Sequence, residues 1–233
     1  MTGQHPVEID TSRPHPARMY DWYLGGKDNY PVDEAMGRQM LALEPRTPVM
    51  ARVNRAFMHR ATRWLAGQGM RQFLDIGTGI PTEPNLHQVA QEIVPDARVV
   101  YCDNDPIVLA HAAALLRGTD EGVTEYLQAD VREPDAILEG ARRILDFDEP
   151  IALSLIALLH FVPDEDAAHE LVGRLLAELP SGSHLVVTHA TADFTPDLSK
   201  EATEKFKAAG VTLALRSREE FTRFFDGLDF VEP

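Results

Sequence analysis

The sequence has a single cysteine, Cys102, in 233 residues. One cysteine cannot close a disulfide within the chain, and it cannot supply a cysteine-rich zinc site or the cysteine cluster that iron–sulfur radical chemistry requires. The nine histidines form no H-E-x-x-H pair, so no metal is predicted. No apolar run reaches the roughly 18 residues that span a membrane, and the amino terminus lacks a hydrophobic signal core. These absences predict a cytoplasmic protein with no membrane partner.

Positive charge is also scarce. The chain has 22 Lys and Arg against 37 Asp and Glu, a formal charge of −15, and no basic run. Nucleic-acid binding needs clustered cations, so it is disfavoured, and a small or weakly charged substrate fits better. Hydrophobic residues make up 44% of the chain, enough for one large domain or one domain with a subdomain. The oligomeric state stays open, a homodimer being one option.

The region from about residue 71 onward alternates between two patterns. Short apolar runs typical of buried strands are separated by helical patterns near 84–94, 106–117, 134–145 and 164–179. The runs read QFLDI, ARVVYC, VTEYLQ, PIALSLIAL and SHLVVTHA. Strands that alternate with helices predict an α/β fold, a Rossmann-like, doubly wound, mostly parallel sheet.

The first 69 residues have a different character. Residues 1–16 contain three prolines and predict an extended arm, and the following segments predict interrupted helices. The last of these helices has Thr47 as its expected N-cap, with an apolar face at helical spacing. That expected face consists of Val49, Val53, Phe57, Ala61 and Trp64. We therefore expect an arm and helical cap over 1–69 and a ligand-binding domain over 70–233.

The carboxyl-terminal segment continues with helical patterns at about 197–209 and 217–227. The stretch LDFVEP then begins what looks like a strand, with no turn or pairing partner after it. We expect the chain to be part of a longer one whose last strand or strands are missing here. A short edge strand is the alternative.

The stretch RQFLDIGTGIPTEP resembles a dinucleotide-binding turn only in part. Gly77 and Gly79 supply the first two glycines of G-x-G-x-x-G, but the third position is Thr82, and Pro81 and Pro84 flank it. The third glycine lets a helix start close to a pyrophosphate, and prolines remove N–H donors for an anion. The loop therefore favours an uncharged nucleoside with a zwitterionic tail.

Acidic residues follow the next two expected strands. Asp103 ends VVYCD, where a carboxylate can accept both ribose hydroxyls of NAD or of an S-adenosyl cofactor, and Asn104 follows it. Asp130 ends LQAD and could accept from an adenine amino group, with Val131 supplying backbone. The alternatives are a helix N-cap for Asp103 and a turn carboxylate for Asp130.

Taken in order, FLDIGTGIPTE, VVYCDNDP, YLQADVREP and LLHFVPDED resemble the motifs of a class I S-adenosylmethionine-dependent methyltransferase. The stretch RPHPARMYDWYLGGKDNYPVD is similar to the signature of one S-adenosyl methyltransferase family, long catalogued as a domain of unknown function. The resemblance covers the chain from about Asp10 onward, and members of that family usually continue a few tens of residues past VEP. It implies S-adenosyl-L-methionine as the cofactor.

The resemblance also implies roles for particular residues. Asp75, Gly77 and Gly79 would contact the amino-acid part of the cofactor, and Ser154 would begin a segment, to Leu159, that lines its adenosine side. In the LGGKDN signature, Gly25 and Gly26 can take positive φ and end the preceding helix. Residues of this cap could close on the methionine carboxylate, namely Arg18, Tyr20 and Lys27. The alternative is a helix turn that only packs the cap onto the sheet.

His160, directly after the fourth expected strand, is the best-placed candidate for a catalytic base. The alternative is a histidine that packs or caps the next helix, and His189 and Asp193 are secondary candidates. The leading hypothesis is a methyltransferase acting on an O, N or C atom of a small molecule, plausibly in secondary metabolism. A module that binds the cofactor without turnover is the alternative, and an NAD-dependent dehydrogenase is disfavoured by the glycine loop.

Overall fold

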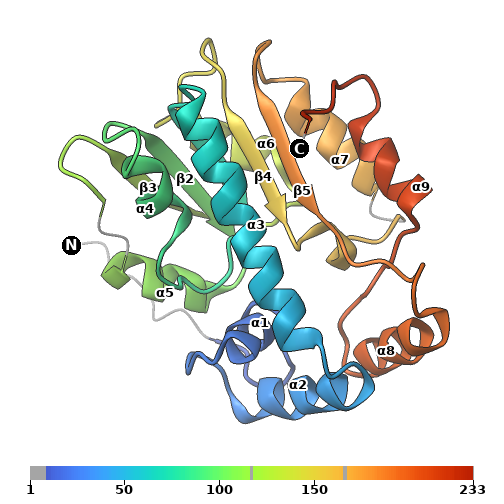
Figure 1. Cartoon of the computed structure of the whole chain (residues 1–233). Coiled ribbons are helices and arrows are strands. Elements are labelled where there is room, and N and C mark those ends of the chain that lie inside the picture. The colour runs from blue at the N-terminus through green and yellow to red at the C-terminus, as the bar shows by residue number, and fades with distance from the viewer. Residues whose placement is uncertain (1–8, 116–117, 165–166, 233) are drawn as a thin grey trace.

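A computed structural model describes residues 9–115, 118–164 and 167–232. Its centre is a five-stranded, all-parallel sheet in the order β3-β2-β1-β4-β5. The strands are β1 (Gln72–Ile76), β2 (Arg98–Asp103), β3 (Val123–Gln128), β4 (Ala152–Ile156) and β5 (His184–Thr188). Helices cover both faces (Figure 1), so the predicted class I, Rossmann-like fold is confirmed.

The central strands form because their residues are apolar along almost their whole length. All five residues of β1 are buried, and β4 is buried up to its last residue. One core, which includes Leu74, Val100 and Leu153, packs one face of the sheet against α6 (Pro134–Ala141) and α7 (Ala168–Leu176). Burial on both faces is what a parallel sheet between two helical layers requires.

The other face is covered by α3 (Thr47–Gly67) and α4 (Leu86–Gln91). Helix α3 was expected to use Val49, Val53 and Trp64 as its inner face, and this expectation is wrong: these side chains are 50%, 59% and 42% exposed. A second stripe on the same helix, with Met58 and Leu65, packs on Phe73 of β1 instead. The expected cap at Thr47 is also shifted by one residue, since Arg46 is the N-cap.

Other helices begin or end close to the expected places. Helix α5 (Pro106–Leu115) ends at the border of the described residues, and the expected positions 116–117 lie outside them. Helix α7 is shorter than the expected 164–179 because Ala167, at φ 54°, stands just before its first turn, and 165–166 lie outside the description. Of the expected arm, residues 1–8 lie outside the description and 9–15 contain no helix.

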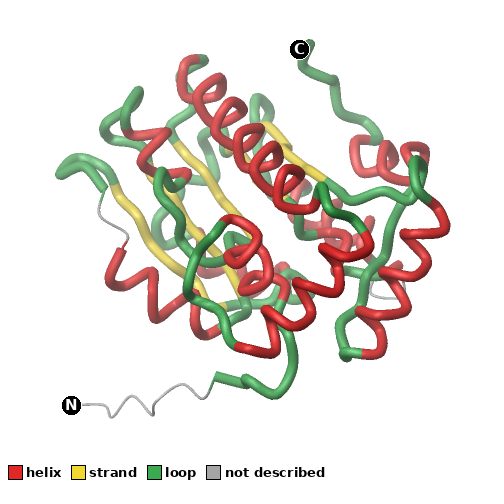
Figure 2. The backbone as a smooth tube through the Cα atoms, turned by 60° about the horizontal axis from the view of Figure 1, so that its bottom comes forward, coloured by secondary structure: helices red, strands yellow, loops and turns green. Residues whose placement is uncertain are grey.

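Three helices lie across the carboxyl ends of the strands: α1 (Pro16–Leu24), α2 (Pro31–Leu43) and α8 (Pro196–Ala208). We call them the cap helices. Met19, Met36 and Phe206 form a small core among them, which contacts Phe161 in the 3-10 helix η1 (Leu159–Phe161) just after β4. In Figure 2, where this edge is turned toward the viewer, the helices stand in front of the strand ends.

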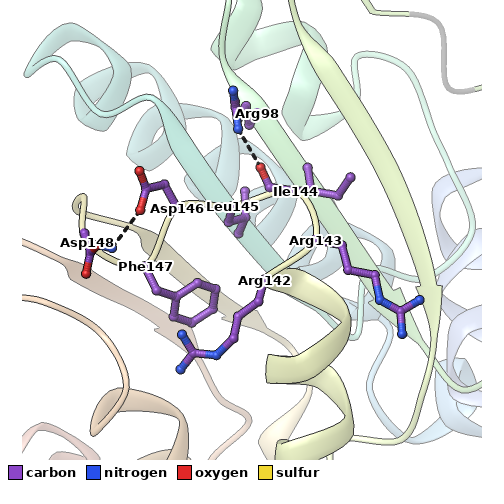
Figure 3. A pocket seen from close by; sticks show the side chains of 8 residues that line it. All are labelled: Arg98, Arg142, Arg143, Ile144, Leu145, Asp146, Phe147 and Asp148. Carbon is purple, nitrogen blue, oxygen red and sulfur yellow. Dashed lines mark hydrogen bonds between the residues drawn. The ribbon is translucent and has the colours of Figure 1, made fainter.

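The opposite, amino edge of the sheet is open. Two cavities of about 410 and 630 Å³ lie there, beside the first residues of the strands, Arg98 and His184 among them. In the smaller one (Figure 3) the Arg98 side chain donates to the Ile144 carbonyl at 2.9 Å. The Arg142 guanidinium lies 4.2 Å from the centre of the Phe147 ring. Both cavities are therefore far from the edge where the predicted ligand residues lie.

Past α8 the chain forms α9 (Arg218–Thr222) and the 3-10 helix η3 (Arg223–Phe225), in place of one helix over 217–227. Residues 228–232 form no strand, so the expected start of a strand is wrong for these residues. Among the helices of the described residues, none combines the length and the apolar character that crossing a bilayer needs.

Candidate functional site

The glycine loop is anchored to the end of β2. Gly77 and Gly79 both take positive φ, 74° and 68°, a conformation that residues with a side chain rarely adopt. The N–H groups of Gly77 and Thr78 donate to the Cys102 carbonyl at 2.7 and 3.2 Å. The Gly79 N–H donates to the Asp103 carboxylate at 2.8 Å. These three donors are used inside the protein and do not point at a phosphate.

Helix α4 starts well after this loop, and its first N–H groups are occupied too. Asn85 and Gln88 form a capping box, and the His87 N–H donates to the Tyr101 hydroxyl at 2.8 Å. A pyrophosphate needs free N–H groups at the start of this helix. The structure therefore agrees with the sequence argument that the proline-containing loop disfavours a dinucleotide.

Asp103, at the end of β2, is held by two backbone donors. One carboxylate oxygen accepts from Gly79 and the other from the Asp105 N–H at 2.9 Å. Only 6% of the residue is exposed, and this burial raises its pKa although both hydrogen bonds lower it. Each carboxylate oxygen keeps a second lone pair, so Asp103 can still accept from two hydroxyl groups.

Asp75, near the end of β1, has no ion pair among the described residues. It pairs in register with Tyr101 on one side and Ser154 on the other, and it is 7% exposed. Burial raises the pKa of Asp75 to about 7, although a hydrogen bond with Thr78 lowers it; nearby Asp103 raises it further. A buried carboxyl group whose pKa lies near neutrality is typical of a functional site.

Arg55 on α3 is a site residue that the sequence argument missed. Its guanidinium donates to the Pro84 carbonyl at 2.8 Å, and the carbonyl also contacts His59 at 2.9 Å. Burial lowers the pKa of Arg55, while the nearby groups of Tyr20, Tyr101 and Asp75 raise it. Arg55 thus brings a positive charge near Asp75 at the end of β1. Arg55 was overlooked because the sequence pattern assigned a different face of α3 to the inside.

The ends of β2 and β3 meet through two predicted site residues. The Asn104 side chain donates to the Asp130 carboxylate at 2.8 Å, and the Arg132 N–H donates to it at 2.9 Å. Burial raises the pKa of Asp130, but these hydrogen bonds outweigh it and the pKa is lowered. Asp130 is thus a half-exposed carboxylate at the rim. Val131 beside it is buried in the core, which leaves its backbone at this edge.

Arg18 lies in a buried ion pair. Its guanidinium makes two bonds to Asp105, at 2.9 and 3.2 Å, and one to the Asp10 carbonyl at 2.8 Å. His15 lies 3.1 Å from the same carboxylate. The predicted contact of Arg18 with a methionine carboxylate is untested, but this geometry commits its charge to fastening α1 onto the residue before α5.

Tyr20 and Lys27 were predicted together with Arg18. The Tyr20 hydroxyl donates to the Ala51 carbonyl and accepts from Asn54, both at 2.9 Å, so it ties α1 to α3. Lys27 is exposed and makes no hydrogen bond or ion pair in the described part of the chain. Their proposed contact with the cofactor stays a prediction.

The LGGKDN signature folds around one carboxylate. Gly25 ends α1 with φ 88°, as expected, whereas Gly26 has no positive φ. A Cβ on Gly26 would lie 1.9 Å from an Asp21 oxygen, so only glycine fits there. The Asp21 carboxylate accepts from the Asp28 N–H at 2.9 Å and from Asn29 at 3.1 Å. The signature therefore has a structural role in shaping the loop after α1.

His160 lies in η1 and is 8% exposed. Its Nδ1 accepts from the Ala190 N–H at 3.4 Å, and its ring is 5.4 Å from the ring of His189. Burial lowers the pKa of His160 to about 3, with further lowering by His189 and Arg216. The imidazole is neutral at physiological pH, but it is a weak base. Its catalytic role stays a prediction, and so does that of Asp193.

The donor set suits an S-adenosyl nucleoside better than a dinucleotide. Carboxylates stand at or near the ends of β1, β2 and β3, and the strand order reverses between β1 and β4, the place where ligands of such sheets bind. Asp103 and Asp130 would hold the sugar and the base, with Asp75 and Arg55 toward the amino-acid end. Within the described residues, no group of three His, Cys, Asp or Glu side chains could hold a metal ion.

Comparisons with known proteins agree with this geometry. The family model described as S-adenosyl methyltransferase matches residues 2–233. A DUF574-family protein from Streptomyces avermitilis is 48% identical, with a TM-score of 0.94 over 97% of this chain and 87% of that chain. A candidate methyltransferase from Thermobifida fusca is 39% identical, with a TM-score of 0.89 over 98% of this chain and 85% of the other. Among curated proteins, no sequence match was found.

Proposed function

Because this chain belongs to the S-adenosyl methyltransferase family, we propose that it transfers a methyl group from S-adenosylmethionine to an oxygen, nitrogen or carbon atom of a small molecule. The family identifies the cofactor, and the nature of the acceptor is our proposal. We further propose that the protein acts in the cytoplasm and that its acceptor belongs to secondary metabolism.

The observation that carries the proposal is the row of carboxylates under the cap helices. Asp75 and Asp103 are buried at strand ends without an ion pair between described residues, which costs stability unless a ligand uses them. In the proposal, Asp103 accepts the ribose hydroxyls and the Asn104–Asp130 pair faces the adenine. Ser154 and the segment up to Leu159 line the adenosine side through their backbone. Asp75 and Arg55 face the ammonium and carboxylate groups of the methionine part.

When bound, the cofactor supplies a methyl group activated by a sulfonium. The residues of this chain then have to orient the acceptor and exclude water. The cap helices are placed to do this, since Ala17 of α1 lies 3.9 Å from where a Cβ on Gly79 would stand. The Leu158 side chain packs on Gly77 in the same way, 2.7 Å from the corresponding position. The glycine loop is therefore covered by α1 and by Leu158.

Two calorimetric titrations test the cofactor assignment. S-adenosylhomocysteine should bind the wild-type protein, and NADH should not, because the N–H groups that a pyrophosphate needs are already occupied. Binding of NADH with equal affinity would refute the assignment. Methyl transfer is then measured with labelled S-adenosylmethionine and a panel of small hydroxyl, amine and activated-carbon acceptors.

A second function is favoured by one observation, the low basicity of His160. If no other group removes a proton from the acceptor, the protein would bind the cofactor or its demethylated product without turnover, as a sensor. The His160→Gln variant tests whether this residue is the base, and the acceptor panel tests whether the protein has any turnover. In an enzyme that uses this base, turnover falls about 100-fold while S-adenosylhomocysteine affinity stays nearly constant. Unchanged turnover assigns His160 to packing, and absence of transfer to every acceptor favours the sensor.

A further inference from the structure

The outward side of α3 carries exposed apolar and basic side chains; one of them, Trp64, also contacts the His184 ring edge-on, with 5.8 Å between the ring centres. Helix α3 crosses one face of the sheet (Figure 1), and its inner stripe packs on β1 and α4. The side chains on the other side are exposed along about four turns of helix. We call this surface the outer α3 face; it consists of Val49, Met50, Arg52, Val53, Arg60, Arg63 and Trp64.

Apolar side chains lie on the outer α3 face near both of its ends, with Val49, Met50 and Val53 in the first turns and Trp64 near the last. Val49, Met50, Val53 and Trp64 are between 42% and 59% exposed and lie on one side of a single helix. Single exposed apolar residues are ordinary, but a row of them along a helix marks an interaction site.

The charge of the outer α3 face is opposite to that of the protein. Helix α3 contains four arginines and no Asp or Glu, in a chain with a formal charge of −15. Arg52, Arg60 and Arg63 form no ion pair among the described residues, although the chain has 37 carboxylates. Some exposed arginines elsewhere, such as Arg38, Arg71 and Arg174, do have acidic partners, whereas Arg143 and Arg218 have none among the described residues. The arginines of the outer α3 face are therefore available to pair with carboxylates of a binding partner.

A second copy of the chain does not supply such carboxylates through the same surface. If two outer α3 faces met across a twofold axis, each would bring the same arginines and no carboxylate, which like-charge repulsion disfavours. An anionic lipid surface would need apolar side chains that reach several ångströms into the bilayer. Val49 and Val53 are short side chains, 50% and 59% exposed, and do not reach that far.

We propose that the outer α3 face binds an acidic amphipathic helix of another protein. Such a helix places leucines or isoleucines against Val49, Val53 and Trp64, while its Asp and Glu residues pair with the flanking arginines. In this mode of helix binding, apolar side chains at helical spacing make the main contacts, and the charges beside them set the specificity. The outer α3 face points away from the sheet and contains none of the residues of the proposed cofactor site, so this inference does not depend on methyl transfer.

Fluorescence anisotropy with a peptide library tests the proposal. The probes are helical peptides of about 15 residues with Leu or Ile at helical spacing and Glu or Asp elsewhere, next to a matched library with Lys in place of the acids. Acidic members should bind wild type, and Arg52→Glu/Arg60→Glu/Arg63→Glu should weaken this binding at least about tenfold. Val53→Ser/Trp64→Ser should weaken it as well, because it removes the apolar anchors.

The matched control is Arg143→Glu/Lys200→Glu/Lys207→Glu, which adds the same negative charge at exposed positions away from α3. It should keep the binding, and thermal melts show whether each variant is folded. An equal loss in the control reduces the effect to net charge and overturns the proposal. So does a library with no acidic binder, or binding of anionic vesicles with the same dependence on the α3 arginines. A wild-type dimer that the α3 variant disperses assigns the surface to self-association instead.

Discussion

The two edges of the sheet differ in whether their charged side chains are buried or exposed. At the carboxyl edge, Asp75, Asp103 and the Arg18–Asp105 pair are buried under the cap helices. At the amino edge, around the two open cavities, charged groups such as Arg71 and Asp96 pair in the solvent. Burying an ion pair or a carboxylate costs more free energy than leaving it in water. The carboxyl edge thus carries charges that stability alone does not explain, whereas the amino edge carries only ordinary surface pairs.

The largest effect is expected at the buried pair. Arg18→Met leaves the buried Asp105 carboxylate with His15 and the Ile107 N–H beside it but without its cation, and we expect the free energy of unfolding to fall by about 3–5 kcal/mol. Urea denaturation measures the change. The double variant Arg18→Met/Asp105→Asn is the control, because it also removes the stranded charge and should recover part of the loss. A fall no larger than that of an exposed pair would erase the contrast between the edges.

Asp75 should make stability depend on pH. Its pKa of about 7 lies above the ordinary 3.8, so between these values the folded protein binds more protons than the unfolded chain. Its contribution to stability is therefore present at low pH and lost as pH rises through 7. The Asp75→Asn variant cannot ionise at this position and does not lose this stability. Its free energy of unfolding relative to that of wild type should therefore rise by on the order of 3 kcal/mol between about pH 4 and pH 8.

Chemical denaturation at several pH values measures that difference between the two proteins. His160 and His189 have the opposite pH dependence. Their pKa values are lowered to about 3 and about 4, so their contribution to the stability of the folded protein is lost as pH falls. Both proteins share them, so they cancel in the comparison. A constant difference across the range would show that Asp75 is ionised in the folded state.

The next effect concerns ligand binding at the carboxyl edge. Asp103→Ala should weaken the binding of S-adenosylhomocysteine by roughly 1–3 kcal/mol, the scale for losing charge-assisted hydrogen bonds. Asp130→Ala should weaken it less, because Asp130 is half-exposed and already bonded to Asn104 and Arg132. Titration calorimetry compares the two variants. Unchanged affinity for Asp103→Ala would remove this residue from the site.

The smallest effect is expected at the amino edge. Arg71→Ala removes an exposed ion pair with Asp96, and exposed pairs contribute little because water and salt screen them. We expect neither the midpoint of urea unfolding nor the affinity for S-adenosylhomocysteine to change measurably. A clear change in affinity would mean that the amino edge communicates with the ligand site.

The sheet could be predicted from the sequence because each strand is a short apolar run with a turn after it. QFLDI and VTEYLQ have the bounds of β1 and β3 in the structure. The orientation of α3 could not be predicted in the same way. Its sequence contains two apolar stripes, and helical periodicity does not say which of them the sheet will cover. Arg55 was missed for the same reason, since its position near Asp75 and the Pro84 carbonyl follows from how α3 is turned.

Sequence alone determined that Asp75, Asp103 and Asp130 would meet at one edge, because parallel strands all end on the same side of their sheet. It also determined the glycine loop without a phosphate cradle, because prolines and capping residues can be read directly. Only the tertiary structure decided that Arg18 pairs with Asp105, 87 positions away, and which carboxylates lose their water. Protonation and pairing depend on burial, and burial is a property of how distant segments pack.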